Sequence, residues 1–414
     1  MATPGITHGV PDLSIQVKGL RLDLPVGGRL IVFSPFWEEN LPLEATVKGI
    51  VTQGYKIPFR LFPKFQRIRQ TPTNPDTKSV LLGEVDSLLK KGAIRRVEHR
   101  VAEGFYSTYF LVPKKTGDLR PILNLKPLNG RVRTPSFRMV TVNSVKETLC
   151  RGDWMATLDL KDAYFHVPIH QSHWKYLRFC INSQCYEYKV LPFGLSTSPR
   201  IFTKVLAPVL AFLAHKGIQT FPYIDDILVT ASSEQELVKK VEQVVQTLNL
   251  AGFLINVAKS SLSPSQDKVF IGARFQTSLD RVSLPVDRAS ALVTLVQSFH
   301  VGLSFPARLW LSLLGKMAST IQVTRNARLF MRPVQMYVLP ILEEVDQDFD
   351  VLIQVTPEVH HHLQWWSSMD NLLSGLPLSP DPSDVKITTD ASSLGWGAVL
   401  GEEEGGGGDS EGGT

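Results

Sequence analysis

The stretch FPYIDDILVT, residues 221–230, places two aspartates side by side inside a run of strand-forming residues. The carboxylates of Asp225 and Asp226 repel each other, and burying them without partners is costly. A hairpin bend is a place where both can stay hydrated or bind a divalent ion, because Mg²⁺ accepts a few carboxylates together with waters and substrate phosphates. The stretch therefore predicts a β-hairpin that carries Asp225 and Asp226 at its bend.

A third acid lies upstream, in WMATLDLKDAYFHVPI, residues 154–169. A strand predicted over 155–160 brings Asp159 to its end, and Asp162 follows three residues later. A phosphoryl-transfer site with two ions about 3.5–4 Å apart usually needs a third acid from elsewhere in the chain, and Asp159 is the natural candidate. Each piece alone has a simpler interpretation, since an Asp-Asp pair is most often a turn or helix cap and Asp159 could cap a strand. Only the combination points to metal chemistry.

The segments around the aspartates alternate between strands and helices. Predicted strands and hairpins cover residues 107–125, 155–160, 174–192, 221–230 and 268–275, and predicted helices cover 77–92, 199–217 and 233–252. This order predicts an α+β fold in which helices cover one face of a mainly antiparallel sheet. The flanking segments are predicted as an irregular stretch over 1–75, helices over 291–299, 307–321 and 358–373, a strand pair over 386–400, and a low-complexity tail over 401–414.

Positive charge is concentrated in one part of the chain. The net charge is +5, and residues 90–138 hold twelve Lys or Arg against three acids, a local excess of +9. The rest of the chain is therefore net acidic, since +5 minus +9 is −4. A solvated basic face is one interpretation, but nucleic acid or nucleotide phosphate is the better-matched partner. Lys114, Lys115 and Arg120 lie near the tip of the hairpin predicted over 107–125, where they could clamp a triphosphate.

The cysteines are Cys150, Cys180 and Cys185. Their number is odd and no C-x-x-C occurs, so we predict neither a disulfide framework nor a zinc site, and we interpret the cysteines as small buried apolar residues. This usage fits a reducing intracellular compartment, cytoplasmic or nuclear. No apolar stretch is long enough to span a membrane and no secretory signal pattern is present, so no membrane partner is expected.

Six stretches in a fixed order resemble a known family. They cover about residues 80–275 and read VPKKTGDLRPILNLKPLN, LDLKDAYFHVPI, LPFGLSTSPRIFTKVL, YIDDILV, NVAKSSL and VFIGARF. The chain resembles the reverse transcriptases of long-terminal-repeat-type retroelements, especially the gypsy-like and tyrosine-recombinase retrotransposons. The resemblance implies a right-hand polymerase with fingers, a palm with an antiparallel sheet and ferredoxin-like core, and a thumb. It implies a lead-in over 1–75, fingers and palm over 76–280, a thumb over 281–345, a connection over 346–384, a partial ribonuclease H segment over 385–400, and a disordered tail over 401–414.

The resemblance also implies roles for single residues. The metal-binding triad falls on Asp159, Asp225 and Asp226, with the backbone carbonyl of Leu160 as a further ligand. The dNTP pocket falls on Lys115, Arg120, Asp162, Ala163, Tyr164, Phe193 and Gly194. The ring of Tyr164 would exclude a 2′-hydroxyl and so select deoxynucleotides, although a core tyrosine is the alternative.

Further roles concern the leaving group and the primer. Lys259 matches a lysine that protonates the leaving pyrophosphate, with a solvated surface lysine as the alternative. Phe270, Ile271 and Gly272 match the primer-gripping turn. One departure lies at Phe193, where retroviral enzymes carry glutamine; another lies at Asn124-Leu125-Lys126, which replaces an Asp-aromatic-Arg pattern.

The stretch TTDASSLGWGAV, residues 388–399, resembles the first strand pair of a retroelement ribonuclease H, with Asp390 as its first metal ligand. One carboxylate does not hold a two-metal site, so this segment is expected to be truncated and inactive by itself.

Together these features predict an RNA-directed DNA polymerase with two Mg²⁺ ions, or Mn²⁺ in their place, that uses dNTPs and an RNA or DNA template-primer. The alternative is a catalytically inactive nucleic-acid-binding relic of a retroelement. The unchanged triad argues against decay, whereas the incomplete ribonuclease H segment argues for it. The sequence does not predict an oligomeric state.

Overall fold

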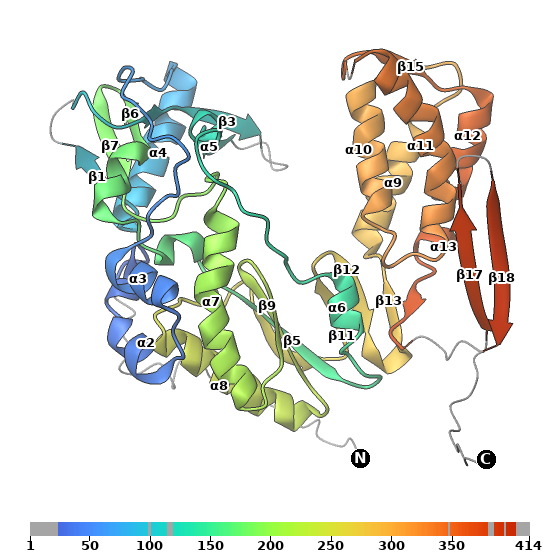
Figure 1. The fold of residues 1–414 in the computed structure, drawn as a ribbon, viewed down its shortest axis with the longest axis horizontal. Helices are drawn as coiled ribbons and strands as arrows, with labels where there is room; N and C mark the ends of the chain where they lie inside the picture. The colour runs from blue at the N-terminus through green and yellow to red at the C-terminus, as the bar shows by residue number, and fades with distance from the viewer. Residues whose placement is uncertain are drawn as a thin grey trace, which may run out of the picture.

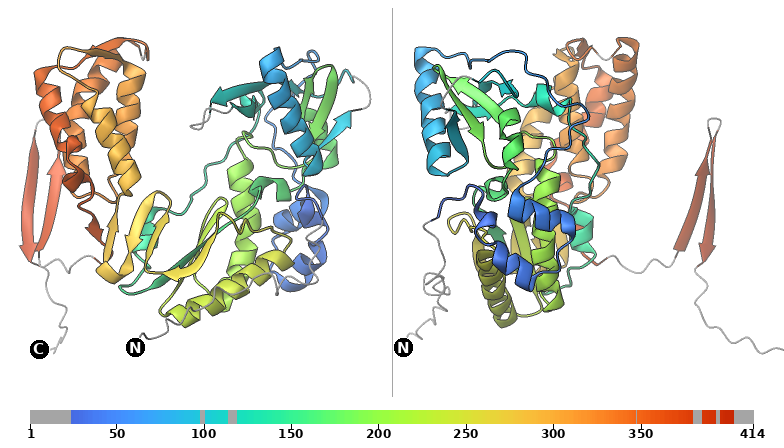
Figure 2. Two further views of the ribbon diagram at one scale, coloured as in Figure 1. Left: turned by 180° about the vertical axis from the view of Figure 1, so that it is seen from behind. Right: turned by 60° about the vertical axis from the view of Figure 1, so that its left-hand side comes forward.

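The computed structural model describes residues 24–97, 101–113, 119–346, 348–379, 385–392 and 395–402. In Figure 1 a layer of β-sheet lies at the bottom, one arm rises on the left and a helical arm rises on the right. The view from behind in Figure 2 shows the same two arms joined through the sheet layer. We call these parts the palm (residues 154–166 and 198–265), the fingers (75–129 and 171–188) and the thumb (286–372).

The palm is a four-stranded antiparallel sheet in the order β10-β5-β9-β8, packed against two helices. Its elements are β5 (Trp154–Asp159), α7 (Ser198–His215), β8 (Thr220–Tyr223), β9 (Asp226–Ala231), α8 (Glu234–Leu250) and β10 (Ser261–Ser265). This chain order and strand order are those of a ferredoxin-like βαββαβ unit. Helix α8 begins where the Ser233 hydroxyl accepts a hydrogen bond from the Glu236 amide, as its sequence predicts. The predicted α+β palm is therefore confirmed.

The fingers contain a second four-stranded sheet in the order β1-β7-β6-β2. Their elements are α4 (Pro75–Lys90), β1 (Ile94–Val97), β2 (Tyr106–Ser107), β3 (Tyr109–Pro113), β4 (Leu119–Leu123), α5 (Lys126–Asn129), η3 (Gln171–Leu177), β6 (Arg178–Ile181) and β7 (Gln184–Tyr188). The predicted turn between β6 and β7 is present, and Asn182 and Ser183 both have the positive φ angles of a two-residue hairpin loop. Across this sheet, the buried carboxylate of Glu187 binds Arg178 at 2.9 Å and Arg95 at 2.8 Å.

The same hairpin corrects our interpretation of the cysteines. Cys180 and Cys185 lie directly opposite each other on β6 and β7 and form a disulfide, whereas Cys150 is exposed. Neither the number of cysteines nor the absence of C-x-x-C spacing reveals that the two-residue loop brings these positions into register. The prediction of three buried thiols is therefore wrong.

The N-terminal stretch also differs from its prediction. Part of the region expected to be irregular folds into η1 (Arg29–Ile31), α2 (Ser34–Asn40) and α3 (Ala45–Gln53). Trp37 is fully buried, and its indole N–H donates to the Ala251 carbonyl at 2.8 Å. Arg29 donates to the neighbouring Gly252 carbonyl at 2.9 Å. These contacts join the short helices to the loop after α8, so the stretch is part of the main apolar core.

A sheet in the order β11-β12-β13-β16 leads from the palm to the thumb. Its strands are β11 (Asp267–Phe270), β12 (Ala273–Gln276), β13 (Arg281–Ser283) and β16 (Leu376–Pro377), with η4 (Thr277–Leu279) between two of them. The thumb elements are α9 (Val286–Gln297), β14 (Ser304–Pro306), α10 (Ala307–Ala318), α11 (Ala327–Glu344), β15 (Leu352–Gln354), α12 (Pro357–Gln364), η5 (Trp365–Ser367) and α13 (Met369–Leu372). They share one apolar core, which contains the fully buried Trp310 and Trp366. The boundary expected between thumb and connection near residue 345 therefore does not separate two cores.

Two remaining segments lie at the edges of the hand. Helix α6 (Val142–Lys146) lies beside the strands β11–β13 at the foot of the thumb (Figure 1). The pair β17 (Val385–Ala391) and β18 (Trp396–Glu402) forms an antiparallel hairpin, which stands apart from the thumb in the right-hand view of Figure 2. That hairpin is the strand pair predicted over 386–400. Within the described ranges, no helix has the length and apolar character that a membrane crossing needs.

Candidate active site

The palm sheet brings the three predicted aspartates to one edge. In the register of β5 and β9, Asp159 lies directly opposite Asp226. The amide of Leu160, the next residue, donates to the Asp225 carbonyl at 2.8 Å. Side chains directly opposite in an antiparallel pair have Cβ atoms about 4.5–5.5 Å apart, so these carboxyls share one face. The three residues are therefore neighbours where the central strands β5 and β9 meet the bend, and their role as a metal-binding triad stays a prediction.

The bend between β8 and β9 holds its shape at a conformational cost. Tyr223 pairs with Asp226, and the two residues between them are Ile224 and Asp225. Ile224 has a φ of 56°, in the left-handed region that a β-branched side chain rarely adopts. Such strain persists only where the surroundings enforce it, and it is common at functional sites.

The electrostatics of the three acids favour a bound cation. Burial first, and then the charges of Asp225 and Asp159, raise the pKa of Asp226 to about 6, against the lowering effect of Lys259. Burial also raises the pKa of Asp159, against the lowering effect of Lys259 and of a hydrogen bond from Asn256. Removing negative charge or adding positive charge at this edge would therefore stabilise the folded chain.

A loop before β10 supports Asp159 from both sides. The amide of Asp159 donates to the Ser260 hydroxyl at 2.9 Å, and the amide of Asn256 donates to the Asp159 carbonyl at 2.8 Å. The Ser260 hydroxyl donates in turn to the Asn256 carbonyl at 2.8 Å. The sequence analysis singled out only Lys259 in this stretch and missed Asn256 and Ser260, although both lie in the quoted motif NVAKSSL.

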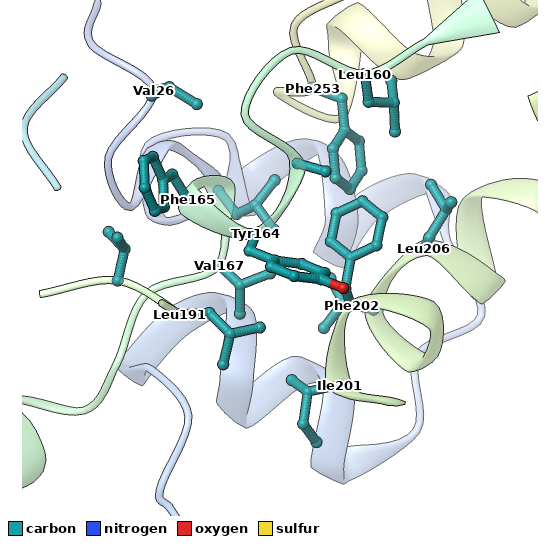
Figure 3. Close-up of a cluster of buried hydrophobic side chains, with 14 of the residues drawn as sticks. Val26, Leu160, Tyr164, Phe165, Val167, Leu191, Ile201, Phe202, Leu206 and Phe253 are labelled. Carbon is teal, nitrogen blue, oxygen red and sulfur yellow. The ribbon is translucent and has the colours of Figure 1, made fainter. Parts of the chain in front are cut away.

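A cluster of aromatic rings in tilted and edge-to-face contact surrounds Tyr164, where the nucleotide pocket is expected. Tyr164, in η2 (Ala163–His166), is only 6% exposed, and its ring lies 4.8 Å from that of Phe193 and 5.8 Å from that of Phe202. Figure 3 shows the Tyr164 ring among Val167, Leu191 and Ile201. Burial and the charge of Asp225 raise its pKa to about 12, so the phenol stays neutral. Phe193 is 55% exposed, so its ring faces solvent on the outer side of this cluster.

Two further polar residues hold this pocket. The side-chain amide of Asn129 donates to the Gly194 carbonyl at 2.8 Å, and its oxygen accepts from the Ser196 amide at 2.9 Å. Asp162 forms an ion pair of 2.7 Å with Lys91, at the end of α4 in the fingers. The sequence analysis missed Asn129 and Lys91, because both contacts join residues far apart in the chain.

Comparison with known proteins agrees with this geometry. Residues 112–275 match the family model described as reverse transcriptase (RNA-dependent DNA polymerase), and this range contains all three aspartates. The chain contains a reverse transcriptase domain. It is 31% identical over 269 residues to the Transposon Tf2-3 polyprotein of Schizosaccharomyces pombe and 30% identical to the Tf2-7 polyprotein. These matches cover 65% of this chain but only 18% of each relative, so the chain spans a small part of those polyproteins.

Solved structures place the reverse transcriptase domain in the right-hand polymerase fold. A foamy viral protease-reverse transcriptase in complex with dsDNA aligns with a TM-score of 0.63 and 19% identity, over 93% of this chain and 80% of that one. The foamy viral protein in complex with an RNA/DNA hybrid aligns with the same TM-score and 18% identity, over 92% of this chain and 54% of that one. At these identities the similarity concerns the fold.

Other expected residues of the reverse transcriptase domain lie at different distances from the triad. Arg120 is exposed on β4, opposite Val112 on β3, whereas Lys114 and Lys115 lie outside the described residues. Lys259 is exposed and close enough to lower the pKa of Asp159 and Asp226.

The expected primer-gripping residues and Asp390 belong to other sheets than the three acids. Phe270 is buried at the end of β11, and Ile271 and Gly272 form the turn to β12. Asp390 is exposed on β17, opposite Gly397, and the palm triad is not part of this hairpin. No group of three metal-ligating side chains is preassembled in the part of the chain that the structure describes, either here or at the triad.

Proposed function

We propose that this chain is an RNA-directed DNA polymerase of a retroelement, which extends a primer with dNTPs on an RNA or DNA template. The observation that carries the proposal is the pairing of Asp159 with Asp226 beside Asp225, within the segment that matches the reverse transcriptase family. Two acids on neighbouring strands, with a third in the adjoining turn, are an arrangement that suits two-metal nucleotidyl transfer.

The donor set fits Mg²⁺, or Mn²⁺ in its place. Carboxylates and a backbone carbonyl are hard oxygen ligands, and the triad with the Leu160 carbonyl would supply them. Burial and the neighbouring carboxylates raise the pKa values of Asp159 and Asp226, so the ionised forms are disfavoured until a cation compensates them. When bound, the two ions would activate the attacking primer 3′-hydroxyl and stabilise the leaving pyrophosphate. The carboxyls, which repel one another, would draw together around these ions.

The chain's own residues would position the reactants. Arg120 and Lys115 would bind the triphosphate, and Asp162 and Ala163 would flank the sugar and triphosphate. The ring of Tyr164, which lies against Phe193, would leave no room for a 2′-hydroxyl, and the Gly194 loop would shape the pocket. Lys259 would protonate the leaving pyrophosphate, because it is exposed beside the acids. The Phe270–Gly272 turn would hold the primer end.

Nucleic acid is the proposed partner because two observations agree. The foamy viral neighbours are described in complex with dsDNA or an RNA/DNA hybrid. The chain itself concentrates positive charge in residues 90–138, most of which lie in the fingers. A grip on phosphates without reading of the sequence suits a polymerase.

A primer-extension assay tests the proposal. On an RNA template with Mg²⁺, the natural chain should add dNTPs, and Asp225→Asn should lower the rate at least about 100-fold through lost charge stabilisation. Asp370→Asn, which changes an exposed aspartate in the thumb, should leave the rate unchanged. Template binding without any extension by the natural chain would instead favour the inactive relic.

A further inference from the structure

The turn between β11 and β12 has an unfavourable local sequence. Its two loop residues, Ile271 and Gly272, have φ angles of 42° and 75°. Two positive φ angles suit a tight hairpin, but asparagine or aspartate usually occupies the first position. Because a β-branched residue strongly disfavours this region, the turn needs support from outside its own sequence.

Arg288 supplies a contact of that kind. It lies in the first turn of α9, and its Nη1 donates to the Gly272 carbonyl. Its Nη2 donates to the Ser319 hydroxyl, at the end of α10, at 2.7 Å. Ser319 donates onward to the Lys316 carbonyl at 2.7 Å. One guanidinium therefore connects the turn with two thumb helices.

The absence of a side chain at Gly272 leaves room for the Arg288 guanidinium. A Cβ added to Gly272 would lie 2.5 Å from Nη1 of Arg288, so glycine leaves the space that the guanidinium occupies. The planar guanidinium donates to two acceptors at once, whereas a lysine ammonium is a point charge on a flexible stem. Among the described residues, no carboxylate lies within ion-pair distance of Arg288, so neutral acceptors hold it.

The contact is accessible to solvent on one side. Arg288, Lys316 and Ser319 line a half-open cavity of about 190 Å³ between α9 and α10. Because the guanidinium is not enclosed in the apolar core, its removal should alter the turn without collapsing the thumb. The apolar residues that join the thumb core, such as Phe270 and Leu284, are buried separately.

We propose that Arg288 is a positioning residue that latches the Ile271–Gly272 turn to thumb helices α9 and α10, so that turn and thumb move as one unit. The kinetic consequence rests on the proposed function: a primer end held at this turn stays aligned when the thumb engages the duplex. The mechanical part, the coupling of turn and thumb, does not depend on catalysis.

Amide hydrogen exchange of the peptide that covers residues 268–276 tests the coupling directly. Arg288→Ala should speed exchange about tenfold or more, because a charged hydrogen bond to the turn is lost. Arg288→Lys, which keeps one donor, and Ser319→Ala, which removes one acceptor, should give intermediate effects. The control Arg308→Ala removes an exposed thumb arginine paired with Asp350 and should change nothing at the turn. The latch would be overturned if exchange were unchanged in both Arg288→Lys and Ser319→Ala. It would also be overturned if Arg308→Ala sped exchange at the turn as much as Arg288→Ala does.

Steady-state primer extension tests the consequence. Arg288→Ala should raise the KM for primer–template about tenfold and shorten the products made per binding event, with kcat for one nucleotide within about twofold. A fall in kcat at unchanged KM would contradict a positioning role. If the natural chain does not extend a primer at all, the proposed function fails, while the exchange result still decides the latch.

Discussion

At the scale of single residues, the raised pKa of Asp226 lowers the stability of the folded chain at neutral pH. Burial first, and then the charges of Asp225 and Asp159, raise its pKa from 3.8 to about 6. The folded chain therefore binds more protons than the unfolded chain between about pH 4 and 6. Stability should fall as pH rises through this window, and the deficit persists at neutral pH.

Asp226→Asn should therefore stabilise the metal-free chain at neutral pH. Because the side chain is about half exposed, we discount the pKa shift for solvent screening and expect a gain of about 1 kcal/mol. The gain should vanish below about pH 4, where the natural carboxyl is protonated in both states. Urea unfolding across pH, with EDTA present, measures it. A variant that is less stable than the natural chain at neutral pH would contradict the assigned repulsion.

Local motifs could predict that the three acids are neighbours, but they could not predict the long-range contacts around them. Asp159 ends a recognisable strand, and Asp225 and Asp226 lie at a recognisable hairpin bend. The partners of Asp159 and Asp162 could not be predicted in this way, since Ser260 is separated from Asp159 by 101 positions and Lys91 from Asp162 by 71. No local pattern records which serine or lysine the fold will bring to a given carboxylate.

At the scale of elements, His166 joins η2 to the loop that supports Asp159. Its ring is fully buried; Nδ1 donates to the Ala163 carbonyl at 3.0 Å, and Nε2 accepts from the Leu254 amide at 2.9 Å. The carbonyl can only accept and the amide can only donate, so these contacts require the neutral ring. A second proton would place two N–H groups against each other.

The buried histidine should make the chain acid-sensitive. Burial lowers the pKa of His166 to about 4, so its contribution is complete above the ordinary value of 6.5 and is lost as pH falls from there to about 4. The expected loss is about 3 kcal/mol in the free energy of unfolding. His166→Gln should be less stable at pH 7 but show a flatter profile over this range. Burial also lowers the pKa of His173, so the difference between the two profiles isolates His166.

Equal slopes for the natural chain and the glutamine variant would refute the assigned tautomer.

Element prediction itself worked best for long or strongly patterned segments, such as α8 and the hairpin around Asp225. It failed for α2 and α3, which have only 7 and 9 residues and owe their helical form to burial of Trp37 and its neighbours against the palm. Propensity alone rarely stabilises helices this short.

At the scale of the whole molecule, the two arms and the charge distribution fit a long anionic partner. The segment 130–141 runs between fingers and thumb from α5 to α6 (Figures 1 and 2), and it carries the exposed Arg133 and Arg138. The sequence predicted the excess charge of this region but not its position between the arms, which depends on how the fingers and thumb are joined through the palm.

Primer–template binding should therefore weaken steeply with salt. A protein that neutralises about six phosphates loses on the order of 10³ in affinity between 50 and 200 mM salt, because bound counterions are released. Arg133→Ala/Arg138→Ala should reduce the slope of log Kd against log salt by about 2, one unit for each lost phosphate contact. Lys216→Ala/Lys239→Ala, which removes two exposed cations, one at the end of α7 and one within α8, should leave the slope unchanged. Fluorescence anisotropy with a labelled RNA/DNA duplex measures both slopes. Equal slopes for the two double variants would show that the nucleic acid does not pass along segment 130–141.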